Sequence, residues 1–151
     1  MTGQHLLASA GTDRTVRIWD PATGEQRGVL RGHRGGVSAV CPLTVDGRDL
    51  LASAGGDAAV RIWDLATGEQ RAVLRGHQDW VTGVSPVTWH GRDGLASASR
   101  DATVRIWDPA AGTCVLTIPT HHPSLTAVSV DGLLAIGLAA GVLVLDLNLD
   151  A

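Results

Sequence analysis

Short apolar runs alternate with polar turn residues along the chain, and the turn signals recur every eight to twelve residues. The apolar runs are rich in Val, Ile, Leu, Thr and Trp, which suit a pleated, half-buried strand. In the central part this pattern predicts strands at 36–42, 50–55, 59–64 and 69–75. Turn residues such as Asp46-Gly47 and Thr67-Gly68 separate them. We therefore expect antiparallel strands joined as a meander, with almost no helix.

The same pattern returns with a constant period. The segment Leu-Ala-Ser-Ala followed by Val-Arg-Ile-Trp-Asp occurs three times, and Trp19, Trp63 and Trp107 are 44 residues apart. A period of roughly 20 to 50 residues indicates supersecondary units that bury their apolar faces against one another. Extended over the whole chain, this period predicts fourteen strands.

A second signature precedes each Trp-Asp pair of the two central units. Gly32-His33 stands before Trp63-Asp64, and Gly76-His77 stands before Trp107-Asp108. In these motifs nearly the whole chain resembles the WD-repeat β-propeller family. The resemblance implies an all-β fold of four-stranded blades around a channel, with strand a innermost and strand d outermost.

The fold class expected from this resemblance is a WD-repeat β-propeller segment of about 3.5 blades (b-c-d, a-b-c-d, a-b-c-d, a-b-c), open or completed by another chain. We expect residues 1–151 to form a single partial propeller. Its parts are blade 1 at 1–33 without strand a, blade 2 at 34–77, blade 3 at 78–121, and a degenerate blade 4 at 122–151 without strand d.

The resemblance also implies a buried hydrogen-bond network in each regular blade. The indole would donate to the Ser oxygen, the Ser hydroxyl to one imidazole nitrogen, and the other imidazole N–H to the carboxylate. The residues concerned are His33, Ser53, Asp57 and Trp63 in blade 2, His77, Ser97, Asp101 and Trp107 in blade 3, and Ser9, Asp13 and Trp19 in blade 1, which has no preceding Gly-His.

Blade 4 departs from this pattern. It keeps His121, and the other three network positions align with Ala135, Ala139 and Leu145. We therefore expect this blade to be held by apolar packing alone, through Leu133, Leu134, Ile136, Val142, Val144 and Leu145.

A row of Ser, His and Asp also describes a hydrolase triad. A nucleophilic Ser needs an exposed oxygen and an oxyanion hole, whereas this one would be buried and already bonded to Trp. We therefore expect structural networks and no enzyme activity. The pair His121-His122 has no carboxylate or Cys at ligand spacing, so we predict no metal and no cofactor. Arg17, Arg61 and Arg105 line up on strand c, and we expect them to be solvated and balanced by nearby acids.

Contact between Asp57 and His33 would bring the d-to-a and b-to-c connections to one rim of the blades. Residues that break the repeat gather there, and variable loops on a constant frame indicate binding. The candidate partner-binding residues are Trp80, Asp79, Gln78, Arg34, Arg14 and Arg100. The alternative for Trp80 is burial between blades, and Trp89 is expected to pack against the base of its blade.

Composition and charge limit the choice of partner. The net charge of −3 gives no reason to approach a polyanion, so we expect no nucleic acid partner. The start of the chain does not read as a signal peptide, and the longest uncharged stretch, 132–145, is too short to span a bilayer, which favours a cytoplasmic protein without membrane contact. The absence of Lys, Phe and Tyr fits a GC-rich bacterial gene.

Together these features predict a non-enzymatic scaffold that presents its rim to a protein partner. The alternatives are a truncated remnant, or half of a split or oligomeric propeller completed by a second copy or a complementary chain; a hydrolase is the weakest.

Overall fold

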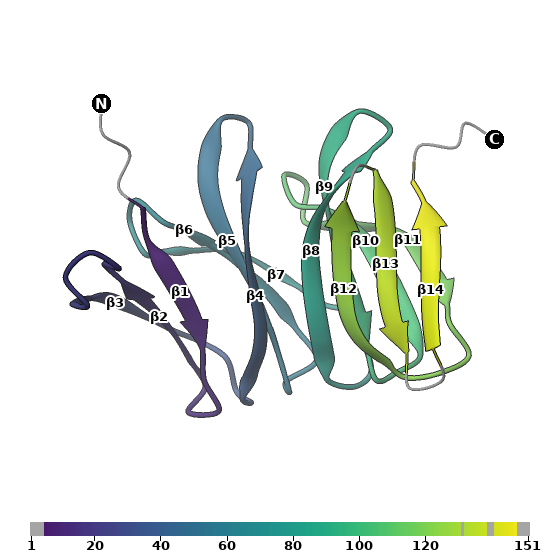
Figure 1. Ribbon diagram of the computed structural model, residues 1–151, viewed down its shortest axis with the longest axis horizontal. Coiled ribbons are helices and arrows are strands. Elements are labelled where there is room, and N and C mark those ends of the chain that lie inside the picture. The colour runs from purple at the N-terminus through teal and green to yellow at the C-terminus, as the bar shows by residue number, and fades with distance from the viewer. Residues whose placement is uncertain (1–4, 131, 139–140, 148–151) are drawn as a thin grey trace.

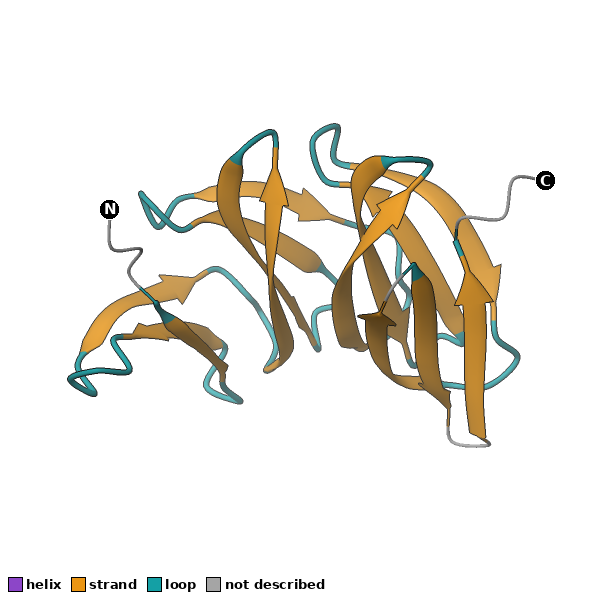
Figure 2. Cartoon of the chain, turned by 45° about the horizontal axis from the view of Figure 1, so that its top comes forward, coloured by secondary structure: helices purple, strands orange, loops and turns teal. Residues whose placement is uncertain are grey.

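The computed structural model describes residues 5–130, 132–138 and 141–147. These residues form fourteen strands in four antiparallel sheets and contain no helix, which confirms the predicted all-β fold (Figure 1, Figure 2). Accordingly, no helix that could cross a membrane is found in this part of the chain.

Each sheet is a meander whose strands pair in chain order. We call the four sheets blades 1 to 4. Blade 1 contains β1 (Leu7–Ala10), β2 (Thr15–Trp19) and β3 (Gln26–Arg31). Blade 2 contains β4 (Val37–Val45), β5 (Arg48–Gly55), β6 (Val60–Asp64) and β7 (Gln70–Leu74). Blade 3 contains β8 (Val81–Trp89), β9 (Arg92–Ser99), β10 (Thr103–Asp108) and β11 (Thr113–Pro119). Blade 4 contains β12 (Ser124–Val130), β13 (Leu133–Leu138) and β14 (Gly141–Asp146).

The hairpin between β4 and β5 is tighter than predicted. Asp46 and Gly47 have φ angles of 50° and 73°, as in a two-residue type I′ turn. This turn carries strand pairing as far as Val45 and Arg48, so both strands extend beyond the bounds expected from hydrophobicity.

The blades stand side by side, with β4, β8 and β12 adjacent (Figure 1). Their facing surfaces form three apolar clusters, one at each junction. Trp63 packs with Val16 and Ile18 of blade 1, and Trp107 packs with Ile62 of blade 2. The face of a blade that carries the tryptophan therefore packs against the preceding blade. Blades 2 and 3 are covered on both faces.

Blade 4 is displaced by one residue from the 44-residue period. The Ser38 hydroxyl of β4 donates to the carbonyl of Val81. The equivalent hydroxyl of β8, that of Thr82, donates to the carbonyl of Ser124 at 2.6 Å. Ser124 therefore takes the place of Val81, and it follows Val81 by 43 residues instead of 44. The strand register shows the same displacement, because Ala127 pairs with Ile136 in blade 4 as Val84 pairs with Ser97 in blade 3. Ile136, and not Ala135, therefore occupies the position of the network serine.

The same displacement corrects the expectation for His121. His121 is exposed with a φ of 62°, and the buried residue 43 positions after His77 is Thr120. Leu145 does take the tryptophan position, since it pairs with Leu134 as Trp107 pairs with Leu95. The expected role of Ala139 lies outside the described residues.

The prediction for the packing of blade 4 was half wrong. Leu134, Ile136 and Leu145 face blade 3. Leu133, Val142 and Val144 lie on the opposite face and are 44%, 70% and 55% exposed. Successive side chains of a strand point to opposite faces, so a strand that is apolar at every position can bury only half of its side chains when one face is covered.

Candidate functional site

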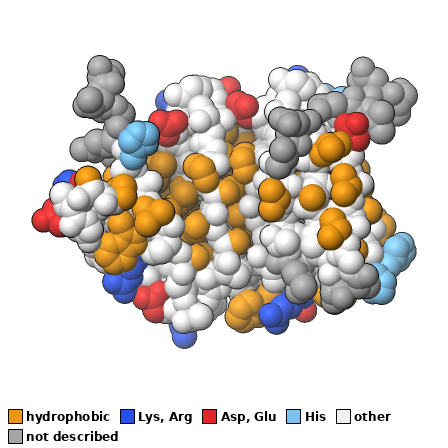
Figure 3. Space-filling view, in the orientation of Figure 1, with side chains coloured by type: hydrophobic (Ala, Val, Ile, Leu, Met, Phe, Trp, Pro, Cys, Tyr) orange, Lys and Arg blue, Asp and Glu red, His pale blue; other side chains and the backbone are white. Residues whose placement is uncertain are grey.

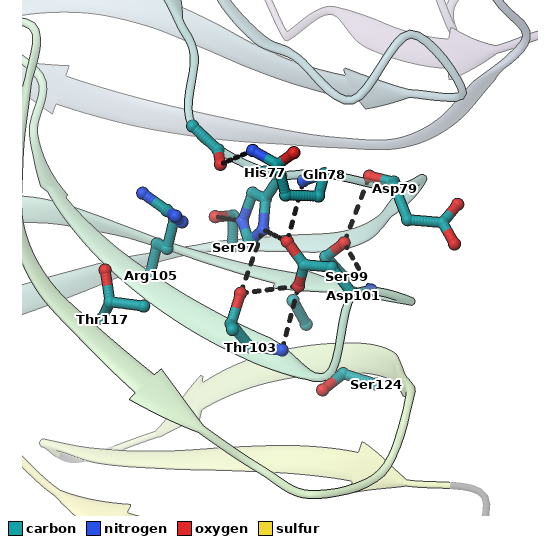
Figure 4. Close-up of polar contacts among 12 residues, drawn as sticks. His77, Gln78, Asp79, Ser97, Ser99, Asp101, Thr103, Arg105, Thr117 and Ser124 are labelled. Carbon is teal, nitrogen blue, oxygen red and sulfur yellow. Dashed lines mark hydrogen bonds and ion pairs between the residues drawn. The ribbon is translucent and has the colours of Figure 1, made fainter.

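The two complete buried networks have nearly identical geometry. In blade 3, His77 Nδ1 lies 2.9 Å from Asp101 Oδ2, and His77 Nε2 lies 2.7 Å from Ser97 Oγ (Figure 4). The Trp107 indole donates to the same Ser97 oxygen at 2.8 Å. In blade 2 the matching distances are 3.0 Å (His33–Asp57), 2.7 Å (His33–Ser53) and 2.8 Å (Trp63–Ser53).

The pKa shifts of the buried groups indicate where the protons lie in these networks. Burial lowers the pKa of His33 and of His77 by more than the neighbouring carboxylates raise it, so both rings are neutral at neutral pH. Burial by itself would raise the pKa of Asp57, but bonds from the Arg34 backbone N–H, His33 and Arg61 lower that pKa to about 2. Each imidazole therefore donates Nδ1–H to a carboxylate and accepts the Ser hydroxyl at Nε2.

This arrangement does not expose a nucleophile. Ser53 and Ser97 have no exposed surface, and each oxygen already bonds an imidazole and an indole. No substrate carbonyl can reach these oxygens, so neither serine has the exposure that a hydrolase nucleophile needs.

Blade 1 holds a partial network. The Trp19 indole donates to Ser9 Oγ at 2.9 Å. The Asp13 carboxylate accepts bonds from the Thr15 hydroxyl and from Arg17 Nη2, at 2.7 and 2.9 Å. Within the described residues no imidazole bridges Ser9 and Asp13.

Of the three strand c arginines, Arg17 is solvated and paired with Asp13 as predicted, whereas Arg61 and Arg105 are not solvated. Arg61 is only 6% exposed and bonds Asp57 and Gln70 at 3.2 and 2.7 Å. Arg105 is half-buried, and like Arg61 it has a buried Nε without a hydrogen-bond partner in the described structure. These side chains pack inside the blades because the neighbouring blade covers the strand.

The networks also fix the loops at one rim, which we call the top rim. Each network carboxylate also accepts a hydrogen bond from the backbone N–H of the residue that follows its histidine. Arg34 N–H donates to Asp57, and Gln78 N–H donates to Asp101, both at 3.0 Å. The backbone of the d-to-a loops is thus anchored from below, while the Arg34 and Gln78 side chains are exposed.

Trp80 is the largest apolar side chain at the top rim. It is 40% exposed, and its ring lies over Gly56 of blade 2, where a Cβ would come within 2.7 Å of the indole. The guanidinium of Arg100 lies 5.0 Å from the ring centroid, within cation–π range. Asp79 Oδ1 accepts the Trp80 backbone N–H at 2.6 Å and holds the loop. Trp80 therefore packs on the neighbouring blade and still presents part of its ring to solvent.

All six candidate partner-binding residues are exposed. The side chains of Arg14 and Arg34 have no hydrogen-bond or ion-pair partner in the part of the chain that the structure describes. Arg31 and Arg75, which the sequence analysis did not single out, are exposed at the ends of β3 and β7 next to the two Gly-His pairs. Their position directly before Gly-His is the sequence signal that could have identified them.

The other candidate residues concern metal ligation and thiol chemistry. In the described ranges no three His, Cys, Asp or Glu side chains come together as metal ligands. Cys41 and Cys114 are free thiols, and burial raises the pKa of Cys41 to about 12. Trp89 is partly buried against the apolar cluster between blades 3 and 4, and its ring centroid lies 4.5 Å from that of His90 in an edge-to-face arrangement.

Comparison with known proteins finds a family model that matches the repeats. The family model "WD domain, G-beta repeat" matches residues 2–20, 24–64 and 68–108. The chain is 48% identical over 48 residues to nuclear distribution protein PAC1-2 of Uncinocarpus reesii, covering 32% of this chain and 10% of that protein. It is 48% identical over 40 residues to nuclear distribution protein nudF 1 of Talaromyces marneffei, covering 26% of this chain and 9% of that protein.

The chain thus spans about a tenth of the length of these curated relatives. Both relatives come from fungi, so the comparisons do not support the expected bacterial origin. The family model, by contrast, covers more than half of the chain and places the three Trp-Asp pairs at the ends of its matches. The chain therefore belongs to the WD40 repeat family.

Proposed function

We propose that this chain is a non-enzymatic scaffold that binds a protein partner through its top rim. WD40 repeats generally mediate protein–protein interaction, which supports the proposal. The observation that carries it is the exposed Trp80–Arg100 pair on loops whose backbone the buried networks hold. Trp and Arg are the side chains most often found at the energetic centre of interfaces. The free thiols are compatible with a reducing compartment such as the cytoplasm.

The charges of the top rim favour an acidic partner. Five arginine side chains are exposed at this rim against the exposed carboxylates of Asp13 and Asp79, whereas Asp57 and Asp101 are engaged in the buried networks. A complementary surface would carry carboxylates around one apolar side chain that packs on Trp80. The rim arginines are Arg14, Arg31, Arg34, Arg75 and Arg100.

Affinity capture with matched variants tests this proposal. The wild-type chain, Trp80→Ala, Arg34→Ala and the control Trp89→Ala would be immobilised and compared by quantitative mass spectrometry of the proteins they retain. A rim partner should be depleted at least tenfold by Trp80→Ala and retained by Trp89→Ala, because Trp89 lies at the opposite end of the blade. A retained set that is the same for wild type and Trp80→Ala would contradict the proposal.

A second candidate function is association through the flank of blade 4. We call the exposed face formed by Val128, Leu133, Val142 and Val144 the outer flank. Val142 and Val144 take the positions that Val104 and Ile106 hold in blade 3, and these are fully buried against the next blade. Figure 3 shows hydrophobic side chains gathered over this sheet on the right of the molecule. An apolar face of this kind favours packing against a further sheet.

Sedimentation of the wild type and of Val144→Asp distinguishes this second function. Association through the outer flank should be lost in Val144→Asp and kept in Trp80→Ala. Association that survives both substitutions would place the contact elsewhere.

A further inference from the structure

Blade 3 contains a pocket at the end opposite the top rim. The pocket has a volume of about 340 Å³. The β8–β9 hairpin and the adjoining ends of β10 and β11 form it, so that every lining residue belongs to blade 3. We call it the base pocket. Its lining includes Trp89, His90, Arg92, Asp93, Asp108 and Val115.

The aspartate that follows the repeat tryptophan makes two kinds of contact in blades 1 and 2. Its Oδ1 accepts backbone N–H groups of the turn that comes next. Its Oδ2 pairs with an arginine of the outermost strand, since Arg27 lies 2.6 Å from Asp20 and Arg71 lies 3.6 Å from Asp64. The repeat therefore supplies a guanidinium for the second carboxylate oxygen.

Blade 3 keeps the carboxylate and lacks the guanidinium. Asp108 Oδ1 accepts the turn N–H groups of Ala110 and Ala111 at 3.0 and 3.1 Å. Val115 stands 44 residues after Arg71, in the place of the arginine. No donor among the described residues reaches Asp108 Oδ2. The base pocket is thus lined by a carboxylate oxygen whose cation is missing.

An aromatic wall stands beside this carboxylate. Trp89 takes the place of Val45 of blade 2, and its ring lies 4.5 Å from the His90 ring, with the two planes at 77°. A guanidinium is planar, stacks on aromatic faces and donates to a carboxylate from the same group. The pair of Trp89 and Asp108 therefore suits a guanidinium better than a compact ammonium group.

The base pocket also has room and a negative balance of charge. Gly94 of its lining takes the place of Leu50, which is buried in blade 2, so no side chain fills this position in blade 3. The carboxylates of Asp93 and Asp108 face one guanidinium, that of Arg92. Arg92 forms no ion pair with either of them within the described part of the chain. A cationic ligand complements this arrangement.

We infer that the base pocket binds the guanidinium of an arginine side chain from an extended segment of another protein. This guanidinium pairs with Asp108 Oδ2 and stacks on Trp89. A protein segment fits the pocket because its margin is open at Val115, which is 44% exposed, whereas sites for small molecules enclose most of the ligand. The base pocket and Trp80 lie at opposite ends of the blade, so the inference goes beyond the proposed function and does not depend on it.

A peptide with a single arginine provides the probe. A short glycine–serine peptide with one central arginine would be titrated into the isotope-labelled chain at low ionic strength, and the Trp89 indole N–H resonance would be followed. The matched control carries citrulline, which keeps the shape of arginine and is neutral. We expect saturable binding of the arginine peptide, at least fivefold tighter than that of the citrulline peptide and tighter than that of acetyl-arginine amide.

Matched variants locate the effect. Asp108→Asn should weaken binding of the arginine peptide at least fivefold. Asp64→Asn is its control and should leave binding unchanged, because Asp64 is already paired with Arg71 in blade 2. Val115→Arg should also weaken binding at least fivefold, because it supplies the ion pair that blades 1 and 2 contain, whereas the neutral Val115→Gln should not. Melting curves would verify that each variant folds.

The possible results are distinct. Equal binding of the arginine and citrulline peptides, or binding that survives Asp108→Asn, would overturn the inference. Tighter binding of acetyl-arginine amide than of the peptide would overturn the assignment to a protein segment. Self-association of the wild type that is lost in Asp108→Asn, measured by sedimentation, would assign the pocket to a second copy of the chain. None of these results bears on the top rim, because Trp80 and Arg100 are unchanged in every variant.

Discussion

Removal of the His77 ring measures how much the network of blade 3 stabilises the fold. His77→Ala deletes bonds of 2.9 Å to Asp101 and 2.7 Å to Ser97, each worth about 1 kcal/mol net. It also leaves the fully buried Ser97 hydroxyl without its acceptor, which costs about 1–3 kcal/mol. Asp101 keeps its bonds from Thr103 and Gln78, so its charge remains solvated by the protein. We expect the free energy of unfolding to fall by about 3 kcal/mol.

Urea denaturation at neutral pH, followed by tryptophan fluorescence and circular dichroism, would give this value. Hydrogen exchange at the Trp107 indole N–H should accelerate in parallel, since that group donates to Ser97. His122→Ala is the control, because His122 is exposed and its loss should change the free energy by less than about 0.5 kcal/mol. A double variant with Ser97→Ala should cost less than the sum of the single variants, because no hydroxyl is then orphaned. A loss below about 1 kcal/mol for His77→Ala, or strict additivity, would contradict this account.

Three further outcomes are expected. Gly83→Ala should lower the free energy of unfolding by about 1–3 kcal/mol in urea denaturation, because a Cβ at this position would lie 2.6 Å from the backbone nitrogen of Ala127. Gly28→Ala is the control, because a Cβ there would meet open space and should not change the stability in this way. Equal effects of the two substitutions would contradict the close contact of β8 and β12. Acidification should lower the free energy of unfolding in two stages. The buried histidines have lowered pKa values in the folded protein, so the unfolded chain binds more protons as the pH falls below about 6.5. The network aspartates have pKa values of about 2 in the folded protein, and they add a second loss of stability between about pH 4 and 2. Unfolding free energies that rise between pH 6.5 and 5 would contradict the first stage. At a concentration at which the chain is monomeric, Val144→Asp should leave the melting temperature within about 2 °C of wild type, because its side chain is 55% exposed, and a larger drop would contradict that exposure.

The strands of the blades could be predicted because they depend on local spacing, and the networks could be predicted because that spacing matches the WD-repeat family. Ser53 and Trp63 lie on the two strands of one hairpin, and the length of the turn between those strands sets which residues meet. The same spacing recurs at Ser97 and Trp107. The indole hydrogen bonds to Ser53 and Ser97 follow from this register.

The contacts between blades could not be read from spacing. Arg61 is buried because blade 2 is covered on both faces, and nothing in its own strand distinguishes it from the more exposed Arg17. The exposure of Trp80 likewise depends on Gly56, a residue of the preceding blade over which its ring lies.

The sequence by itself therefore determined the period and the strands of each blade, and its resemblance to the WD-repeat family indicated which Ser, His, Asp and Trp meet. Only the tertiary structure decided the one-residue displacement of blade 4, which places Ile136 and not Ala135 toward blade 3. Strand β13 is apolar on both faces, so its hydrophobic pattern does not specify which face is buried. Packing of blade 4 against blade 3, through β12 on β8 and β9 and through the apolar cluster that contains Ile136, made that choice and left the outer flank exposed.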